Sequence, residues 1–513
     1  MTWPKPLGIR LCKTESPALV LLKADGTRIE YSWEQYNTKS LQSLHTLKTE
    51  GVMPGDFIAV IATNLPESFF VMSAIIMAGA IIVPINFPVV KEPGYNELKS
   101  ILKDCQPKLV ATNECLIKYL LGSGIGCMSF EDIINLGEGE TEQVTSFVND
   151  IQEDKLMVMP YTSGTTGNPK GVMLNYKNIS NRVKAVSRVF GITQKERLLS
   201  YLPLGHISEL VATFFGQLDN GYTVYFTEHI KEITENRENF RKAFPKILAD
   251  VKPTIFLAVP KIWSNLRIGV EKQIKPIPNF LFQISFIKNF VANRIKSKLG
   301  LDNTRFFISA SARLFPEDKK FFAGLGININ DIYGQTETAG PIIMDGQIIG
   351  DANVFAGEDS EITVAGNCVM MGYYKIDKTF VNGYGTGDRG SWQSGRVLFQ
   401  GRIKDGFKLS QGEFVSEAKI ELLENEIRKI DGVQEVIVCG ESKPYMVALI
   451  FSPDHQSGYL KEDIQKALTL ISEGIYKVKK FILLNPSQLE LTSTLKVKRS
   501  KIIQKFQQQI DQL

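Results

Sequence analysis

The sequence predicts a protein of the α/β class with a large N-terminal domain of stacked, mostly parallel sheets and helices. Short apolar runs alternate with segments of helical period through the first two-thirds of the chain, which is typical of parallel sheets. From about Gly340 the pattern changes to short strands and glycine-rich turns, which predicts a small β-barrel-like unit. Beyond Gly401 lies a compact α+β stretch of about a hundred residues, enough for a small separate domain. We therefore expect domains at residues 1–402 and 403–513.

The expected strands of the N-terminal domain follow one another in order. They are residues 57–62 (FIAVIA), 81–83 (IIV), 109–111 (LVA), 223–226 (TVYF) and 254–259 (TIFLAV). The second of them lies in an uncharged run, residues 69–90, which is long enough to cross a membrane. Because Gly79 and Pro84 interrupt this run, a buried helix, turn and strand is a better interpretation than a membrane span.

Composition and charge exclude several classes of protein. The 59 basic and 55 acidic residues leave a net charge of +4, too weak a field to favour nucleic acid. The six cysteines form no CxxC pair and the four histidines do not cluster near them, so neither a zinc site nor a disulfide framework is expected. The N-terminus, MTWPKPLGIRLCK, lacks the apolar core of a signal peptide. These features indicate a cytoplasmic protein.

Residues 272–298 form a basic stretch in which lysines and arginines are interleaved with phenylalanines. A basic amphipathic helix of this kind can lie on a membrane surface. A solvated helix with a buried aromatic face is the better interpretation, since that is the usual helical pattern. We therefore expect at most peripheral membrane contact.

The most informative segment is Tyr161–Gly171 (YTSGTTGNPKG). It lies between apolar runs and is therefore expected to be a loop held by buried strands. Hydroxyls, glycines that let backbone N–H groups approach, and one lysine are the groups that bind phosphate. It is not a Walker A loop, since the chain contains no Gly-Lys dipeptide, and a flexible surface turn is the alternative. The candidate phosphate-binding residues are Thr162, Ser163, Gly164, Thr165, Thr166, Gly167 and Lys170.

This segment resembles the phosphate loop of the acyl-adenylate-forming (AMP-binding) superfamily, which includes acyl-CoA synthetases, peptide-synthetase adenylation domains and luciferases. A second motif of that family follows in order, DIYGQTE, from Asp331 to Glu337. The resemblance implies that Tyr333 packs on adenine, that Thr336 contacts the α-phosphate and that Glu337 binds magnesium. It also assigns Asp331 and Gly334 to the nucleotide site. Mg²⁺ prefers a carboxylate together with phosphate oxygens, which suits Glu337.

Three further motifs extend the resemblance over nearly the whole chain. In GTGD, Asp388 would accept hydrogen bonds from the ribose hydroxyls. The same stretch spells GxGxxG, but a strand is expected after it instead of the helix of a Rossmann motif. In GRIKD, Arg402 would contact the ribose or phosphates and Lys404 would form the hinge, and Lys408 continues the pattern.

The last motif, LTSTLKVKR, resembles the family's C-terminal motif that holds the catalytic lysine. Alignment on the family's GKxxR places that lysine at Lys496, with Lys498 as the alternative.

Several strings resemble the long-chain acyl-CoA synthetase branch in particular. In YLPLGHISE, the resemblance places His206 on the acyl side of the active site. The alternative is a partly buried histidine satisfied by backbone groups. The adenine-side segment, SASAR, contains Ser311 and Ala312 but departs from the usual glycine-rich form, and Arg313 stands where the family has proline.

The resemblance implies that a fatty acid reacts with MgATP to give acyl-AMP, which then passes to coenzyme A. ATP, Mg²⁺ and coenzyme A are the expected cofactors. The small C-terminal domain is expected to be mobile and to swing about Lys404 between the two steps. Two alternatives stay open: an acyl-acyl carrier protein synthetase, and a catalytically silent protein that binds an acyl group or a nucleotide.

Overall fold

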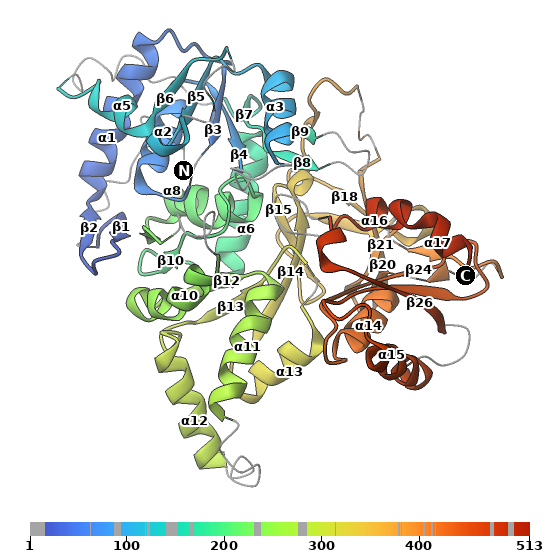
Figure 1. The fold of residues 1–513 in the computed structure, drawn as a ribbon. Coiled ribbons are helices and arrows are strands. Elements are labelled where there is room, and N and C mark those ends of the chain that lie inside the picture. The colour runs from blue at the N-terminus through green and yellow to red at the C-terminus, as the bar shows by residue number, and fades with distance from the viewer. Residues whose placement is uncertain are drawn as a thin grey trace. The chain divides into compact units, whose positions relative to one another are not determined.

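The structure is a computed structural model, and its contacts divide the chain into two compact units (Figure 1). Unit 1 comprises Met1–Asn353 and Ala365–Gly383, and unit 2 comprises Val354–Val364 and Tyr384–Leu513. The described residues are 16–61, 63–86, 94–117, 120, 124–139, 152–163, 169–229, 237–274, 285–312, 314–377, 380, 382–403, 406–411, 414–415, 417–471, 477–490 and 497–513.

The largest sheet of unit 1 has eight strands, in the order β19-β9-β7-β4-β3-β5-β6, with β8 paired to β9. The pairs from β7 to β6 are parallel, whereas the pairs that involve β9 are antiparallel. The strands are β3 (Phe57–Ile61), β4 (Ile81–Ile85), β5 (Leu109–Thr112), β6 (Cys127–Ser129), β7 (Leu156–Val158), β8 (Tyr161–Ser163), β9 (Pro169–Asn175) and β19 (Gly372–Tyr373). The helices before and between them are α1 (Trp33–Thr49), α2 (Pro66–Met77), α3 (Gly94–Cys105), α4 (Glu114–Ile117) and α5 (Phe130–Asn135).

The long apolar run folds as the predicted helix, turn and strand. All residues of α2 except Glu67 are buried, and so is every residue of β4, as expected for a parallel strand covered on both faces. Gly79 lies in the turn between them with a φ of 71°. In the part of the chain that the structure describes, no helix combines the length and apolar character needed to cross a membrane.

Unit 1 contains two smaller sheets. One has the order β10-β11-β1-β2, and the other has the order β12-β13-β14-β15-β16. Their strands are β1 (Leu19–Leu22), β2 (Arg28–Tyr31), β10 (Arg197–Leu199), β11 (Thr223–Thr227), β12 (Ile255–Ala258), β13 (Phe306–Ser309), β14 (Ile329–Gln335), β15 (Gly340–Met344) and β16 (Gln347–Ile348). The helices associated with them are α6 (Tyr176–Phe190), α7 (Ile207–Glu209), the π-helix η2 (Leu210–Phe215), α8 (Gly216–Asn220), α10 (Arg237–Val251), α11 (Pro260–Ile274), α12 (Ser285–Lys298), α13 (Pro316–Gly324) and the 3₁₀ turn η4 (Thr336–Thr338).

Unit 2 begins with part of the predicted β-rich segment, a four-stranded sheet in the order β17-β18-β20-β21, whereas β15, β16 and β19 of that segment belong to sheets of unit 1. A two-stranded ribbon and a three-stranded sheet, β24-β25-β26, follow. The elements are β17 (Asn353–Ala356), η5 (Glu358–Ser360), β18 (Glu361–Ala365), β20 (Tyr384–Gln393), β21 (Arg396–Arg402), β22 (Phe407–Lys408), β23 (Phe414–Val415), α14 (Glu417–Arg428), β24 (Glu435–Cys439), β25 (Met446–Phe451), α15 (Gly458–Ile471), β26 (Val478–Leu484), η6 (Pro486–Gln488), α16 (Arg499–Lys505) and α17 (Gln507–Asp511).

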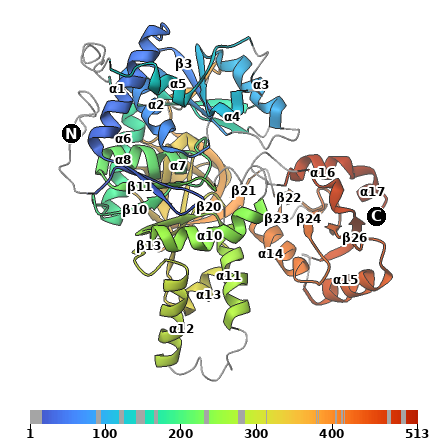
Figure 2. The same ribbon diagram turned by 60° about the vertical axis from the view of Figure 1, so that its left-hand side comes forward.

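Helices cover both faces of the last sheet (Figure 2). Along β24, Val436 and Val438 pack with α14 and α15, whereas Ile437 and Cys439 pack with α16 and α17. This alternation follows from the two-residue period of a strand. The pair of helices on each face packs apolar side chains against the sheet, so the sheet is buried on both sides.

The predicted fold class is confirmed, including the β-rich unit and the compact α+β region. The compact units divide the chain at different positions from the predicted boundary at residues 402 and 403, since β18, β20 and β21 group with the C-terminal elements. The boundary at 402 concerns which part moves during the reaction and stays a prediction. Within the described residues Cys105, Cys127, Cys368 and Cys439 are free thiols.

Candidate active site

A β-hairpin in unit 1 frames the predicted phosphate loop. β8 pairs antiparallel with β9, so that Thr162 lies opposite Lys170 and Ser163 lies opposite Pro169. At the base of the hairpin, the Tyr161 hydroxyl donates to Asp104 Oδ2 of α3 at 2.6 Å, and burial raises the pKa of this tyrosine. The hairpin therefore holds Lys170 of β9 beside Thr162 of β8. The tip residues Gly164, Thr165, Thr166 and Gly167 lie outside the described residues.

One predicted nucleotide segment follows the carboxyl end of β13, and the other occupies the second half of the neighbouring parallel strand β14 and the turn after it. The last parallel pair of these strands is Ser309 with Asp331, so both segments lie toward the carboxyl edge of the sheet, where ligands bind in α/β sheets. Ser311 has a φ of 72°, in the left-handed region that favours glycine. A non-glycine residue adopts this conformation at a cost of about 1–2 kcal/mol. Ser311 therefore adopts a conformation that glycine adopts readily, although the segment departs from the glycine-rich form.

Glu337 lies in a tight turn between β14 and β15. A Cβ atom on Gly334 would lie 2.1 Å from the Gly340 carbonyl oxygen, so only glycine fits there. The Gln335 backbone N–H donates to the Thr338 hydroxyl at 3.0 Å, and that hydroxyl donates to the Gly340 carbonyl at 2.9 Å. These contacts close the turn and fix the backbone of Glu337, which is 9% exposed. Tyr333 and Thr336, the flanking predicted residues, are half-buried on the same segment.

Tyr373 contacts both predicted motifs, and sequence analysis missed it. Its hydroxyl donates to Glu337 Oε1 at 3.0 Å, and Lys170 Nζ lies 5.3 Å from the centroid of its ring. The tyrosine is one of 16 and lies 36 positions from Glu337, so no local pattern in the sequence distinguishes it. Through this residue, the tertiary structure brings the phosphate-loop lysine near the predicted magnesium carboxylate.

Arg182 of α6 supports the strand that follows the Glu337 turn. Its side chain is fully buried, and Nη1 donates to the carbonyls of Pro341 at 2.9 Å and Ile349 at 3.2 Å. Asp351 lies 3.8 Å from its Nη2 atom. Burial lowers the pKa of the guanidinium, while Asp351 opposes that shift. The sequence carried no signal for this arginine, because it is one basic residue on an amphipathic helix.

In unit 2, the two predicted ribose-binding residues are cross-strand partners. Asp388 of β20 lies opposite Arg402 of β21, and Arg402 Nε lies 3.2 Å from Asp388 Oδ1. Asp388 is buried and Arg402 is exposed. The GxGxxG-like stretch lies inside β20 and opens no helix, so the exclusion of a Rossmann motif is confirmed. Lys408 lies in β22, and Lys404 is outside the described residues.

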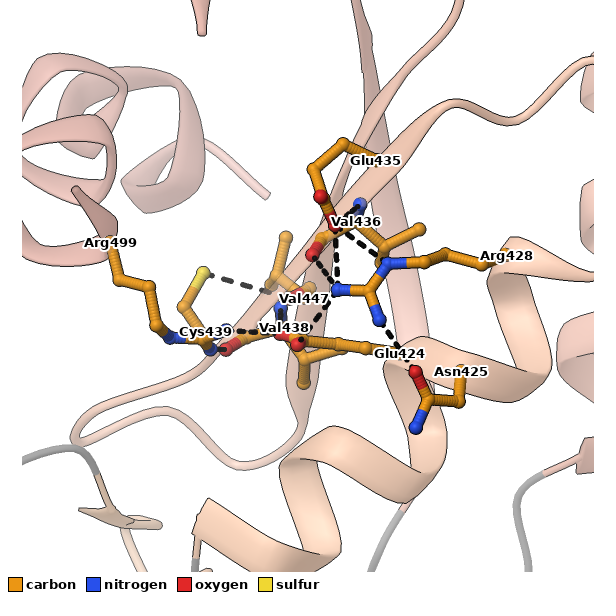
Figure 3. Close-up of polar contacts among 9 residues, drawn as sticks. All are labelled: Glu424, Asn425, Arg428, Glu435, Val436, Val438, Cys439, Val447 and Arg499. Carbon is orange, nitrogen blue, oxygen red and sulfur yellow. Dashed lines mark hydrogen bonds and ion pairs between the residues drawn. The ribbon is translucent and has the colours of Figure 1, made fainter. Parts of the chain in front are cut away.

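The C-terminal motif ends at an anchored arginine. Arg499, the first residue of α16, donates from Nη1 to Glu424 Oε1 at 2.6 Å and from Nη2 to the Val438 carbonyl at 3.0 Å (Figure 3). Lys498 occupies the N-cap position of the same helix. Lys496 lies outside the described residues, so the choice between the two lysines stays a prediction.

His206 occupies the N-cap position of α7 and is half-buried. Its backbone carbonyl accepts hydrogen bonds from the N–H groups of Glu209 and Leu210, both at 3.1 Å. Glu209, three residues further in the same motif, is fully buried, and the chain continues as the π-helix η2. Such segments are frequent at functional sites. The place of His206 on the acyl side stays a prediction.

The residues around Glu337 fit a magnesium ion that arrives with a nucleotide. Among the described residues, no group of three or more His, Cys, Asp or Glu side chains is placed to hold a metal. Mg²⁺ commonly keeps several waters and takes one or two carboxylates together with substrate phosphates. Glu337 would supply one carboxylate, and Lys170, which contacts the same tyrosine, would supply a cation for the phosphates.

Comparison with known families defines the class of protein. A family described as AMP-binding enzyme matches residues 12–374, and its C-terminal domain matches residues 408–513. The chain therefore belongs to the family of AMP-binding enzymes, which confirms the resemblance found in its motifs. It is an adenylate-forming enzyme.

Curated relatives agree with the predicted branch. The chain is 25% identical to the mouse long-chain-fatty-acid–CoA ligase ACSBG2 over 79% of this chain and 74% of the relative. It is 24% identical to the *Arabidopsis thaliana* long chain acyl-CoA synthetase 2 over 94% of this chain and 87% of the relative. It is 28% identical to the rat long-chain-fatty-acid–CoA ligase 5 over 81% and 71%.

Solved structures of low identity share the fold. The McyG A-PCP complexed with phenylalanyl-adenylate superposes with a TM-score of 0.80 at 18% identity, over 99% of this chain and 83% of that chain. The *Bacillus subtilis* O-succinylbenzoate coenzyme A synthetase in complex with AMP gives a TM-score of 0.75 at 20% identity, over 98% of both chains. These likenesses establish the architecture of the chain.

Proposed function

We propose that the protein activates a fatty acid with ATP to acyl-AMP and transfers the acyl group to coenzyme A. The observation that supports this proposal is the contact of Tyr373 with both Lys170, the proposed cation for the phosphates, and Glu337, the proposed carboxylate for magnesium. The names of the curated relatives support a fatty acid as the substrate and coenzyme A as the acceptor.

In the first step, a carboxylate oxygen of the fatty acid bonds to the α-phosphorus of ATP, and the bond to pyrophosphate breaks. Magnesium, when bound at Glu337, neutralises charge on the phosphate oxygens. Lys170 and the phosphate loop bind the phosphates, Thr336 contacts the α-phosphate, and Lys496 neutralises charge that develops in the transition state. Catalysis in this step is positioning and electrostatic stabilisation.

The remaining predicted residues bind the nucleotide and the acyl group. Asp388 accepts hydrogen bonds from the ribose hydroxyls, and Arg402 contacts the ribose or phosphates. His206 lines the acyl side. The adenine side is formed by Ser311, Ala312, Asp331, Tyr333 and Gly334.

In the second step, the sulfur of coenzyme A bonds to the acyl carbonyl carbon, AMP leaves, and the thiol proton passes to solvent. We propose that residues 403–513 first swing about Lys404, which removes Lys496 and opens a path for the thiol. Lys408 moves with this domain.

The direct test is to incubate the purified protein with ATP, Mg²⁺ and a panel of fatty acids, with and without coenzyme A. Mass spectrometry should detect acyl-CoA only when coenzyme A is present. Acyl-AMP without any acyl-CoA would overturn the assigned acceptor and direct the search to an acyl carrier protein. If no acid yields AMP, the proposed reaction is wrong.

A half-reaction assay tests the domain swing. Lys496→Ala should lower acyl-AMP formation by at least about 100-fold, as loss of a charge-stabilising group does. The same variant should still convert supplied acyl-AMP to acyl-CoA, because Lys496 has left the site in that step. Lys498→Ala is the matched control. An equal loss of both half-reactions in Lys496→Ala, or the selective loss in Lys498→Ala instead, would contradict the assignment.

A further inference from the structure

The segment that carries Tyr373 is held between the two predicted motifs by its backbone. The Met370 N–H donates to the Glu337 carbonyl at 2.9 Å, and the Met371 N–H donates to the Met173 carbonyl of β9 at 2.9 Å. The Tyr374 N–H donates to the Gly171 carbonyl of the same strand at 2.8 Å. These three bonds join the Glu337 turn to the strand that begins beside Lys170, so the position of Tyr373 is fixed from both sides.

The side chain of Tyr373 makes two different contacts from this position. In the register of β19 and β9, Tyr373 lies opposite Val172, and Lys170 lies two residues away on the same face of β9. This places Lys170 Nζ 5.3 Å from the ring centroid, within the range of a cation–π interaction. The hydroxyl at the far end of the ring donates to Glu337 Oε1 at 3.0 Å.

The two contacts have separate chemical consequences. A hydrogen bond donated to a carboxylate oxygen orients the carboxylate, and such outer partners tune how a carboxylate binds a metal ion. The aromatic face attracts the lysine ammonium and limits where it can lie. The ring of Phe380 lies edge-on to Tyr373 at 6.4 Å between centroids and restricts its rotation.

We propose that Tyr373 is a positioning residue that orients Glu337 for a magnesium ion through its hydroxyl and holds Lys170 for the nucleotide phosphates through its ring. This inference rests on the proposed function for the identity of the ligand, MgATP. It assigns the two halves of one side chain to two measurable properties, the magnesium requirement and the affinity for the nucleotide.

The test is equilibrium binding of ATP to the full-length chain across a magnesium series, which needs no turnover. Tyr373→Phe should raise the Mg²⁺ concentration for half-maximal binding by about tenfold, the low end of the range for removing a partner of a metal ligand. At saturating Mg²⁺ its affinity for ATP should be unchanged, because the phenyl ring still faces Lys170. Tyr373→Leu should show the same magnesium shift and also bind ATP more weakly at saturating Mg²⁺.

Tyr374→Phe is the matched control, since the Tyr374 ring packs edge-on against Phe57 at 5.2 Å and lies on a different side of the segment. It should leave both properties unchanged. An unchanged magnesium titration in Tyr373→Phe, or an equal shift in Tyr374→Phe, would overturn the inference, and thermal unfolding of each variant excludes a general loss of fold. If the wild type binds MgATP and the variants behave as expected, but no acyl-AMP is formed, the proposed function alone is wrong. If the wild type binds no MgATP, both the proposed function and this inference are wrong.

Discussion

Glu209 in unit 1 and Glu424 in unit 2 are both almost fully buried, at 1% and 2% exposure, but their neighbours differ in charge. Glu209 Oε1 accepts hydrogen bonds from neutral groups: the Ser200 hydroxyl at 2.6 Å, the Thr213 hydroxyl at 3.0 Å and the Asn64 amide at 3.2 Å. Burial raises the pKa of Glu209 to about 8, and these hydrogen bonds offset only part of the shift.

Glu424 is surrounded by cations. Arg499 lies 2.6 Å from Oε1, Arg428 lies 3.5 Å from Oε2, and the Val438 N–H donates to Oε1 at 2.7 Å (Figure 3). Burial again raises the pKa, but both arginines act against it. A second carboxylate, that of Glu435, pairs with Arg428 at 2.6 Å and completes the cluster.

The comparison shows how the same side chain serves two purposes. A buried carboxyl among neutral donors holds a proton near neutral pH, whereas one between arginines is stabilised in its charged form and ties distant segments together. Glu424 joins α14 to Arg499, the first residue of α16 and the last residue of the motif that holds the predicted catalytic lysine. Glu209 lies in the motif that holds His206, where it introduces a pH dependence.

The largest expected effect comes from removing a cation from Glu424. Arg499→Met should lower the free energy of unfolding by about 3–5 kcal/mol, since it leaves a buried carboxylate without its nearest partner. Burial raises the pKa of Glu424, and a protonated Glu424 needs the arginine less, so the loss should become smaller as the pH is lowered. Urea unfolding of the full chain over a pH series measures it.

Arg428→Met is the control for this prediction. Arg428 lies farther from Glu424, at 3.5 Å, and its side chain is 30% exposed. Its loss should therefore destabilise the chain less than the loss of Arg499. If both substitutions lower the free energy of unfolding equally, the distance of each arginine from Glu424 does not determine its contribution.

The next effect concerns Glu209 and pH. Burial raises its pKa to about 8 in the folded chain from an ordinary value of 4.5, so between these two pH values the folded state holds a proton that the unfolded state releases. The contribution to stability is therefore complete below the unfolded pKa and is lost as pH rises toward the folded value. Between pH 5.5 and 7.5 the loss should be about 2–3 kcal/mol.

Glu209→Gln should remove this part of the pH dependence, because a glutamine cannot titrate. Urea unfolding at several pH values measures the difference between the variant and the wild type. Glu138→Gln, at an exposed position, is the control and should follow the wild-type curve. Parallel curves for Glu209→Gln and the wild type would show that Glu209 does not change protonation on folding in this window.

The smallest effect comes from the neutral donors around Glu209. Ser200→Ala removes the hydroxyl at 2.6 Å and should cost about 1–2 kcal/mol. Because this hydrogen bond lowers the pKa of Glu209 in the folded chain, its loss should also extend the pH-dependent fall in stability to higher pH. Ser43→Ala is a suitable comparison, since that buried hydroxyl donates to the Lys39 carbonyl within α1 and should cost less. A pH curve that moves to lower pH in Ser200→Ala would contradict the assigned role of the hydroxyl.

Local patterns predicted the secondary structure of several segments well. The uncharged run at residues 69–90 was interpreted as a helix, turn and strand, and α2, Gly79 and β4 confirm it. The strands expected at residues 109–111 and 223–226 are β5 and β11. Apolar periodicity and turn residues act over a few positions, so they can be read without knowing the rest of the fold.

The candidate site was predicted only in part. The motifs identified Lys170 and Glu337 separately, but not the tyrosine that contacts both, because Tyr373 lies in a short strand with no pattern of its own. The arginine that supports β15 was missed for a similar reason, since the burial of Arg182 depends on the carbonyls of Pro341 and Ile349. Lys496, the predicted catalytic residue, lies outside the described residues and stays a prediction.

The sequence by itself determined the α/β class, the order of the motifs and the family, because these depend on local periodicity and on short strings of residues with defined chemistry. Only the tertiary structure decided which charged groups meet, for example Lys170 and Glu337 at Tyr373, and Arg499 at Glu424. Such contacts join residues far apart in the chain. Their energies depend on burial and on neighbouring charges, which no local stretch of sequence contains.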